Sequence, residues 1–464
     1  MKHSAYSTYK DSGVGWLGRI PAHWKVNRLK FIARRKDVKL DADEGNHLRY
    51  VGLENVESWT GKVVKGEERI PEAVSNLFSA DDTLFGKLRP YLAKACNPSF
   101  DGLCSSELLV LRSCSQERRF FLYQLLSEGF ISLVDSSTYG AKMPRADWEF
   151  IGSCVLPSPP RPEQVAIADF LDCKTAEIEA LVAKKRALTE KLKEKRAALI
   201  SRTVIRGLPP DEARAAGFQP NPKMKSYGVE WLGNVPEHWN VTKLGRHIRL
   251  LTGYPFNSEL FSFIDGIKLV RGDNVTEGEL RWGDKTRCWN EPYRDLQEYL
   301  LAASDVLIGM DGSKVGKNYA LVQTSDLPLL LVQRVARLRT KNTLQTGFLL
   351  RLIGSSLFQT WVELVKTDPA VPHISPHDIR DFPLALPPLP EQRAIADFLE
   401  RETVKIDSLV AKVEQAIERL LEYRTALITA AVTGKIQVSG QRGLGGLDGL
   451  GDKALKGVAG GACD

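Results

Sequence analysis

Two histidines in the stretch HISPH, His373 and His377, are the first residues whose types and spacing could do chemistry. Histidines four residues apart can lie on one turn of a helix and bind the same metal ion. Pro376 lies between them, however, and the sequence offers no evident third cluster of ligands. The pattern therefore favours ordinary histidines over a metal centre.

Three other stretches resemble parts of catalytic sites. NEPY at 290–293 is close to the Asn-Pro-Pro-Tyr signature of amino-methyltransferases that flip a base, but one proline is missing. Residues 37–39, Asp-Val-Lys, could belong to a nuclease site, although a second metal-binding acid has no clear candidate. GLGGLDGLG at 443–451 has the composition of a phosphate-binding loop, but no strand precedes it and no helix follows it. We therefore expect a chain that is not itself an enzyme.

The composition is that of a globular protein too long for one core. The chain has 464 residues, 43% hydrophobic and 26% charged, and chains beyond about 300 residues divide into domains. Seven cysteines form no C-x-x-C pair, which fits a reducing compartment. The net charge of +7 permits nucleic-acid binding without requiring it. No apolar run reaches the roughly 18 residues of a membrane span, so we expect a cytoplasmic protein without a membrane partner.

Two phrases occur twice in the chain and indicate its organisation. GVGWLGRIPAHWKV at 13–26 returns as GVEWLGNVPEHWNV at 228–241, and RPEQVAIADFLD at 161–172 returns within LPPLPEQRAIADFLE at 386–400. The copies keep the same order, so each half is a segment of roughly 150 residues that closes with a proline-led helix start. The sequence therefore predicts a tandem of two similar units, each a globular part followed by a helix.

The interiors of the two halves have diverged, although short echoes remain. YVGLENV at 50–56 corresponds to LVRGDNV at 269–275, and SADDTLFGK at 79–87 corresponds to AASDVLIGM at 302–310. Short apolar runs bounded by Gly, Asp and Asn are typical of strands and turns, whereas stretches such as 119–134 have helical spacing. We expect two globular parts of mixed α and β structure, and an α+β fold overall.

Long helices are predicted after each PEQ phrase. Residues 163–205 contain no Gly or Pro and are rich in Ala, Leu, Lys and Glu. In both copies apolar positions recur at alternating three- and four-residue spacing, which favours a coiled coil between two helices of roughly 60 Å. Two helices that each lie on their own domain are the alternative. The predicted pairing positions are Ile178, Leu181, Leu188, Leu192 and Leu199, interrupted by Lys185 and Lys195, and Ile406, Leu409, Val413, Ala416, Leu420, Tyr423 and Leu427.

These features divide the chain into six segments. They are a first globular domain at 1–158, a first helical region at 159–207, a linker at 208–226, a second globular domain at 227–386, a second helical region at 387–435 and a disordered tail at 436–464. The linker is rich in Pro, Gly and Asn, and the tail is low in complexity and rich in Gly.

The phrases G-V-x-W-L-G-x-x-P-x-H-W and L-P-P-L-P-E-Q-R-A-I-A-D-F-L resemble the specificity subunit of type I restriction-modification systems. The likeness covers residues 9 to about 435, in the same order and twice. It implies two target recognition domains, each of which reads one half of a bipartite, asymmetric DNA site. It also implies that the two long helices pair as an antiparallel coiled coil, set the spacer and dock two adenine methyltransferase subunits. S-adenosylmethionine would then be bound by those subunits, with no cofactor on this chain, and nuclease or translocase subunits could join.

Two other functions fit parts of the pattern. A coiled-coil adaptor would join two partners without DNA binding, and salt-dependent binding to DNA separates it from a DNA reader. A chain that both recognises and methylates DNA needs cofactor and catalytic motifs that the sequence does not offer. The sequence therefore favours a non-catalytic, DNA-binding subunit.

Candidate DNA-reading residues are basic and polar side chains in the loops of the globular parts. Arginine can bind guanine through two hydrogen bonds, and lysine can bind guanine or hold a phosphate. For each residue, a solvated charged surface is the alternative. The candidates are Lys87, Arg89, Tyr91, Lys94, Tyr139 and Lys142 in the first half and Lys314, Lys317, Arg334 and Arg337 in the second.

Overall fold

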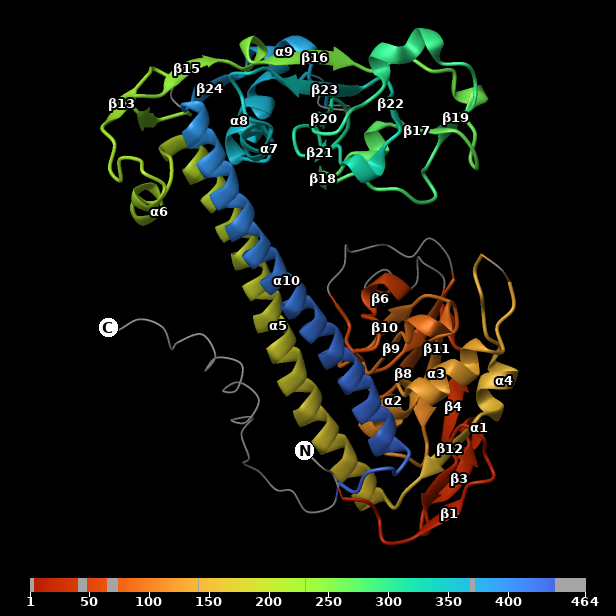
Figure 1. The fold of residues 1–464 in the computed structure, drawn as a ribbon. Coiled ribbons are helices and arrows are strands. Elements are labelled where there is room, and N and C mark those ends of the chain that lie inside the picture. Colours follow the sequence, from red (N-terminus) through yellow and green to blue (C-terminus); the bar gives the residue numbers. More distant parts are fainter. Residues whose placement is uncertain are drawn as a thin grey trace, which may run out of the picture. The chain divides into compact units, whose positions relative to one another are not determined.

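The chain forms two compact units in a computed structural model, which describes residues 4–40, 48–64, 74–140, 142–229, 231–367 and 372–438. The first unit takes the residues up to 185 together with those from 415 onward, and the second takes 186–414. Each unit contains one globular part and adjoining portions of both long helices (Figure 1). Most of the predicted tail, from 439 onward, lies outside the described residues.

Short strands form most of the globular part of the first unit. They are β1 (Tyr9–Asp11), β2 (Arg19–Pro21), β3 (Lys25–Arg28), β4 (Ala33–Lys36), β5 (Lys39–Leu40), β6 (Arg49–Val51), β7 (Ser75–Phe78), β8 (Thr83–Gly86), β9 (Ala95–Cys96), β10 (Gly102–Cys104), β11 (Leu108–Ser113) and β12 (Val155–Ser158). The sheet orders are β4-β11-β8-β9 and β5-β7-β10-β6, and β1 pairs with β2 and β12 with β3. Strand β11 lies between β4 and β8, so its apolar residues are buried in the core.

Four short helices cover the sheets of the first unit. They are α1 (Leu29–Ile32), α2 (Arg118–Leu125), α3 (Glu128–Asp135) and α4 (Trp148–Ser153). Phe85 of β8, Phe121 of α2 and Phe130 of α3 are fully buried in one cluster. The carboxylate of Glu117 caps α2 because it accepts a hydrogen bond from the Phe120 amide at 2.7 Å. Helices α2 and α3 therefore pack through aromatic residues in the same cluster as Phe85 of β8.

The second unit repeats this plan. Its strands are β13 (Met224–Ser226), β14 (Asn234–Pro236), β15 (Asn240–Lys243), β16 (Ile248–Thr252), β17 (Ile267–Val270), β18 (Glu277–Gly278), β19 (Cys288–Trp289), β20 (Val306–Gly309), β21 (Tyr319–Leu321), β22 (Leu329–Leu331), β23 (Val335–Thr340) and β24 (Pro383–Leu386). The shorter helices are α6 (Pro210–Ala215), α7 (Thr346–Ile353), α8 (Ser356–Val365) and α9 (Pro376–Asp381). The order β16-β23-β20 matches β4-β11-β8, and the pair β15-β24 matches β3-β12. The predicted tandem α+β fold is therefore confirmed, and the predicted linker contains α6 and β13.

No single helix of the described segments is both long and apolar enough to cross a membrane. Helices α7 and α8, which meet at a 59° bend, reach that length and composition together. Phe348, Leu352 and Phe358 of this pair are buried in the core of the second unit.

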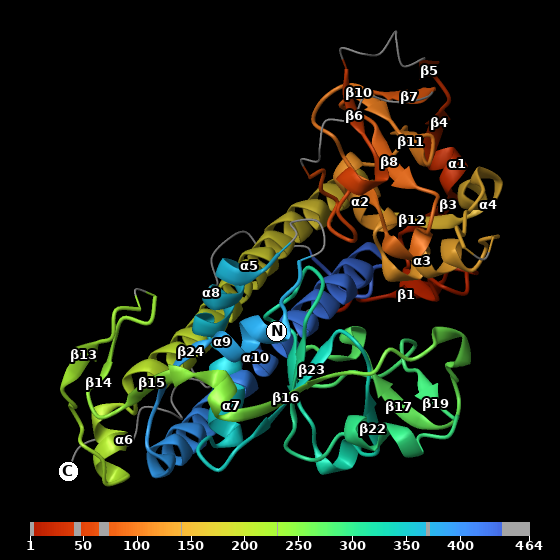
Figure 2. The same ribbon diagram turned by 90° about the horizontal axis from the view of Figure 1, so that it is seen from above.

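The long helices α5 (Arg161–Arg206) and α10 (Leu389–Val432) lie side by side and antiparallel (Figure 2). In the first unit Ile167 near the start of α5 packs in one cluster with Ile428 near the end of α10. Further along α5, Glu179 lies 3.5 Å from Arg424, which precedes Ile428 on α10. Successive residues of α5 therefore contact residues of α10 in the reverse order, so the two helices are antiparallel.

The same antiparallel pairing holds in the second unit. Val204 near the end of α5 shares a cluster with Ile395 near the start of α10. Earlier on α5, Arg196 lies 2.9 Å from Asp407, which follows Ile395 on α10. The long helices thus pair with each other, as predicted.

Some predicted pairing positions are exposed. Leu188 of α5 is 45% exposed while Thr189 is buried, and Leu409 and Tyr423 of α10 are 49% and 48% exposed. The structure therefore favours a four-then-three spacing, in which the residue after the predicted one is the less exposed at these places: Thr189 and Arg424 are buried and Val410 is half-buried. The other predicted positions are buried or half-buried: Ile178, Leu181, Leu192, Leu199, Ile406, Val413, Ala416, Leu420 and Leu427.

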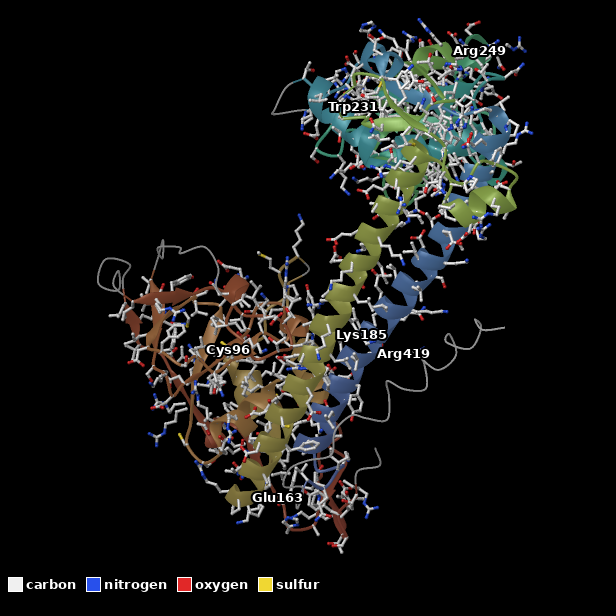
Figure 3. The ribbon with its side chains drawn as sticks, turned by 90° about the vertical axis from the view of Figure 1, so that its left-hand side faces the viewer. Cys96, Glu163, Lys185, Trp231, Arg249 and Arg419 are labelled. Carbon is white, nitrogen blue, oxygen red and sulfur yellow. The ribbon has the colours of Figure 1, made fainter. Side chains whose placement is uncertain are left out.

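A repeated glutamate explains why both phrases occur twice. Glu163 lies in the first turn of α5 (Figure 3). Its Oε2 lies 2.9 Å from His23 Nε2 and accepts a hydrogen bond from Trp24 Nε1 at 3.1 Å. The same two distances recur in the second copy, between Glu391, His238 and Trp239. The Trp-His phrase and the PEQ phrase are therefore the two halves of one structural clamp.

The glutamine of the PEQ phrase fixes the start of each long helix. Gln164 Oε1 accepts a hydrogen bond from the Glu117 amide at 2.7 Å, and its Nε2 donates to the Pro159 carbonyl at 2.8 Å. The matching bonds of the second copy, both 2.8 Å long, join Gln392 to Gln345 and Pro387. Both glutamines are buried. They fix the start of α5 to the N-cap residue of α2 and the start of α10 to the N-cap residue of α7.

A buried aspartate accounts for the echo between SADDTLFGK and AASDVLIGM. The fully buried Asp82 carboxylate accepts hydrogen bonds from Arg112 Nε at 2.5 Å and Lys36 Nζ at 2.7 Å. In the second unit the Asp305 carboxylate accepts from Arg339 Nε at 2.7 Å. Both aspartates tie the strand that leads to the candidate interface to its neighbour in the sheet.

Candidate nucleic-acid interface

The predicted reading residues of the first unit lie on two segments joined by hydrogen bonds. After β8 the chain continues through residues 87–94, which we call the first reading segment. The Lys87 carbonyl accepts from the Ala146 amide at 3.0 Å, and the Arg89 amide donates to the Pro144 carbonyl at 2.7 Å. The first reading segment is thus held beside the stretch that carries the other predicted residues.

Two aromatic rings and two cations are exposed on these segments. Tyr91 is 46% exposed and Tyr139 57%, and Arg89 and Lys142 are exposed as well. Arg89 has a φ of 50°, and its Nη2 donates to the Lys142 carbonyl at 3.4 Å. Side chains of these types can contact phosphates and base edges.

The other two predicted residues of the first unit, Lys87 and Lys94, are less exposed. Lys94 Nζ donates to the Leu53 carbonyl at 2.5 Å, and burial lowers the pKa of Lys94 although Glu54 opposes that shift. Lys87 is half-buried. Lys94 therefore anchors the first reading segment to the helical turn Leu53–Asn55, because its ammonium donates to the backbone there.

In the second unit β20 leads into the corresponding loop, residues 311–318. Lys314 and Lys317 of this loop are exposed. Gly316 has a φ of 79°, and a Cβ atom there would lie 2.9 Å from the Val362 side chain of α8. Glycine is therefore required where the loop packs on α8, and this packing presents both lysines to solvent.

The two predicted arginines of the second unit differ in their surroundings. Arg334 is exposed, and its Nε lies 3.1 Å from Asp311 Oδ2. The other carboxylate oxygen of Asp311 contacts His373 Nδ1. Arg337 is half-buried on β23, where its Nη1 donates to the Glu298 carbonyl at 2.8 Å and burial lowers its pKa. Arg334 thus belongs to an exposed charged cluster, whereas Arg337 supports the fold.

The two histidines of HISPH bind different carboxylates. Ser375 caps α9 and Pro376 is its first residue, so His373 lies before the helix and His377 within it. His377 Nε2 lies 3.5 Å from Asp381, whereas His373 contacts Asp311. Among the described residues, no three His, Cys, Asp or Glu side chains gather as ligands for a metal.

Both units use the same backbone arrangement at this place but different side chains. An isolated bridge joins Leu88 to Arg145, and its counterpart joins Asp311 to His373. In the first unit the Arg145 side chain binds Glu107 through Nε and Nη2 at 3.0–3.2 Å. In the second unit Asp311 contacts both Arg334 and His373. Equivalent positions therefore carry different charges in the two units.

Sequence reasoning did not single out several exposed residues of the second unit. Phe263 and Ile264 are 70% and 87% exposed, and the Arg287 guanidinium lies 4.2 Å from the centre of the Phe263 ring. Tyr254 is 37% exposed, and its carbonyl accepts from the Gln333 amide at 2.9 Å, next to the charged cluster. An apolar run suggests a buried strand, but the Asp-Gly pair after Ile264 is a turn signal that could have indicated an exposed tip.

Residues 237–419 match the protein-family model of the type I restriction modification DNA specificity domain. This part of the chain is similar to the type I DNA specificity domain. The match covers the interface loops of the second unit and most of α10, and it supports the resemblance seen in the repeated phrases.

Two similar proteins are specificity subunits of type I restriction enzymes. The EcoAI subunit from Escherichia coli is 31% identical over 201 residues, which cover 43% of this chain and 34% of that protein. The MjaVIII subunit from Methanocaldococcus jannaschii is 24% identical over 434 residues, 90% of this chain and 94% of that protein. The chain thus spans about a third of the first relative and nearly all of the second.

A solved structure from a study of complex assembly and conformational transition of the type I R-M system has a similar fold. The TM-score is 0.65 at 20% sequence identity, and the match covers 89% of this chain and 98% of that one. The likeness of fold extends over both units.

Proposed function

We propose that this protein is the non-catalytic, DNA-reading subunit of a type I restriction-modification complex. Each globular part reads one half of a bipartite, asymmetric site. Two adenine methyltransferase subunits, which bind S-adenosylmethionine, carry out the chemistry, and nuclease or translocase subunits join for restriction. Since its substrate is DNA and its partners act on DNA, we place the complex in the cytoplasm.

One observation carries this proposal: the same scaffold appears twice with different exposed side chains. The first unit presents Arg89 and Lys142 beside two tyrosines, whereas the second presents Lys314, Lys317 and Arg334. Equal scaffolds indicate equal tasks, and unequal side chains indicate different sequences to be read. A coiled-coil adaptor that never touches DNA has no need for two sets of exposed cations on matched loops.

The exposed apolar residues of the long helices support the docking of protein subunits. In the second unit Leu188, Val404 and Leu409 are 45%, 55% and 49% exposed. In the first unit Leu421 and Tyr423 are 42% and 48% exposed. Apolar side chains beside a helix seam are a common feature of surfaces that bind another protein.

Reconstitution with the methyltransferase subunits of a type I system from the same genome tests the function. The complex should methylate adenine in a split site, and the isolated chain with S-adenosylmethionine should transfer no methyl group. DNA affinity should fall by about a thousandfold or more between 50 and 200 mM salt if six or more phosphates are contacted. Sequencing for methyladenine and binding titrations at several salt concentrations give the two readouts.

A matched variant makes this test specific. Changing Arg89, Lys142, Lys314 and Lys317 to glutamine should reduce the salt slope, because each lost phosphate contact lowers it by about one. The same change at four exposed lysines of α5, Lys184, Lys191, Lys193 and Lys195, is the control. A stable complex with no affinity for DNA at low salt would instead favour the adaptor.

Lengthening both helices should lengthen the spacer between the half-sites. Four residues inserted after Lys185 in α5 and four after Glu414 in α10, where the two units divide, add about 6 Å and a rotation of about 40°. That length is nearly two base-pair steps of 3.4 Å. Methylome sequencing should find the same half-sites with a spacer one to two base pairs longer.

The control for this insertion is four residues placed after Gly217, in an exposed segment outside both long helices. That variant should keep the original spacer. If the helix variant is active on the original spacer, the helices do not act as a ruler, and flexible tethering of the reading domains is the better account.

A further inference from the structure

A buried arginine of α10 joins the helix pair to the globular part of the first unit. Arg424 is 3% exposed. Its Nη1 donates to the Trp59 carbonyl at 2.5 Å, and its Nη2 donates to the Thr60 carbonyl at 3.2 Å and lies 3.5 Å from Glu179 Oε1. Burial of a guanidinium is costly unless it is hydrogen-bonded, and these partners offset part of that cost, although Nε has no hydrogen-bond partner among the described residues.

The loop that Arg424 holds also contacts the first reading segment. The Trp59 amide donates to the Ala93 carbonyl at 3.1 Å. On the other side of the loop, Lys62 pairs with Glu179 of α5. A chain of direct contacts therefore runs from the seam of the helix pair, through Trp59, to the first reading segment.

Strained backbone is concentrated along this chain of contacts. Trp59, Arg89 and Ala93 have φ values of 66°, 50° and 46°, the left-handed region that non-glycine residues rarely adopt. The described residues contain five non-glycine residues with positive φ, so three of them lie here. Such conformations persist only where the surroundings hold them. Arg424 supplies part of that hold, because it fixes the carbonyl of Trp59.

The equivalent arginine of the second unit makes a weaker attachment. Arg196 occupies the same place relative to Glu163 that Arg424 occupies relative to Glu391. It pairs with Asp407 at 2.9 Å, but its side chain is 32% exposed against 4% for Arg424. Within the described segments, no hydrogen bond links Arg196 to a loop of the second globular part.

We propose that Arg424 is a positioning residue for sequence discrimination by the first domain. It holds Trp59, which holds Ala93, and so fixes Arg89 and Tyr91 in the orientation that reads DNA. Reading by the first domain then depends on the helix pair at this point, whereas reading by the second domain does not depend on Arg196. The inference rests on the proposed function, since it assigns a role in reading a half-site.

Two variants of the full complex, Arg424→Met and the matched Arg196→Met, test the proposal. Methylation rates are measured on three duplexes: the cognate site, one with a mismatch in the first half-site and one with a mismatch in the second. Arg424→Met should reduce discrimination at the first half-site by at least tenfold and leave the second within twofold. Arg196→Met should leave both within twofold.

Hydrogen exchange gives a readout that does not require DNA. In Arg424→Met, amides of residues 57–62 and 87–94 should exchange at least tenfold faster than in the wild type, because Trp59 and Ala93 lose their support. Arg196→Met should leave these amides unchanged. If Arg424→Met does not fold, Arg424→Lys, which keeps a charge near Glu179 but cannot bridge two carbonyls, takes its place and should show the same pattern.

Unchanged exchange in these segments, or equal loss of discrimination at both half-sites, would overturn the assignment of Arg424. A wild-type complex that methylates no bipartite site would instead refute the proposed function. In that case the exchange experiment still decides whether Arg424 holds the first reading segment.

Discussion

Replacing residues 29–154 by a second copy of residues 244–382 should convert the recognised site into one whose two halves are the same. The first half-site should disappear, and the second should be read twice. Helix α5 begins in the first unit and ends in the second, whereas α10 begins in the second and ends in the first. The two identical half-sites should therefore be inverted repeats.

The structure makes these cut points suitable. Strand β3 pairs with β12, with Arg28 opposite Val155, and β15 pairs with β24, with Lys243 opposite Pro383. Each interior therefore enters and leaves its unit through two neighbouring strands. The clamp formed by the PEQ glutamate lies outside both exchanged segments, so it is left intact.

Two contacts with the long helices are compatible with the exchange. The Gln345 amide, which binds Gln392, would meet Gln164 in the first unit. Arg351, which pairs with Glu400, would take the place of Tyr123, which donates to Asp172 at 2.7 Å. Both of these new pairs keep a donor opposite an acceptor. Arg424 would lose the carbonyls of Trp59 and Thr60 and keep Glu179, so the hybrid should be less stable than the wild type.

The exchange is measured by methylome sequencing. Each mismatched base pair costs about 1–3 kcal/mol, so several mismatches should reduce methylation of the original site more than about a hundredfold. The control is the reciprocal exchange, in which residues 29–154 replace 244–382. Its complex should recognise the first half-site twice. Methylation of the original asymmetric site by either hybrid would contradict separate reading by the two globular parts.

Changing Asp82 to alanine should destabilise the first unit by about 1.5–3 kcal/mol, the range for hydrogen bonds to charged groups, because the side chains of Arg112 and Lys36 are each 34% exposed. The substitution leaves the Arg112 guanidinium and the Lys36 ammonium without their buried carboxylate. The neighbouring Asp81 is the matched control, since its side chain is 79% exposed and lies 3.4 Å from the same guanidinium. Asp81→Ala should cost less than about 1 kcal/mol. Urea unfolding of both variants, with the wild type beside them, gives the free energies.

The contribution of Asp82 should depend on pH in a defined direction. Burial alone would raise the pKa of Asp82, but the hydrogen bonds from Arg112, Lys36 and Ser79 outweigh burial and lower it. A lowered carboxyl pKa stabilises the folded chain above the pKa of the unfolded chain, about 3.9, and this stabilisation is lost as the pH falls through the folded value. The difference between wild type and Asp82→Ala should therefore shrink below about pH 4. A difference that stays constant down to pH 3 would contradict this account.

The sequence predicted the framework well because repetition is visible without structure. Trp24 and Glu163 appear in phrases that return as Trp239 and Glu391, and the structure joins them at the same distance in both copies. The phase of the helix seam was harder to predict. Leucine at 188 fits an apolar pattern better than Thr189, yet the threonine is the buried residue. Periodicity alone does not separate two apolar stripes that lie one residue apart.

The candidate interface was predicted less completely, since contacts with distant backbone decide which charges are free. Lys94 and Arg337 have suitable side chains, but the carbonyls of Leu53 and Glu298 bind them. Arg424 interrupts an apolar pattern, so no search for apolar pairing positions would have selected it. Its role depends on a loop that lies far away in the sequence.

The split composition of the first unit has a consequence for the order of events during biosynthesis. The second unit is one continuous segment, whereas the first needs residues from both sides of it. At about 5–20 residues per second, the ribosome needs roughly ten seconds or more to make residues 186–414. Throughout that interval Leu17 and Arg19 lack Lys435, whose ammonium donates to both of their carbonyls. The unit whose synthesis begins first is therefore the last to be completed, and a chain that stops before residue 415 would contain the whole second unit and an incomplete first unit.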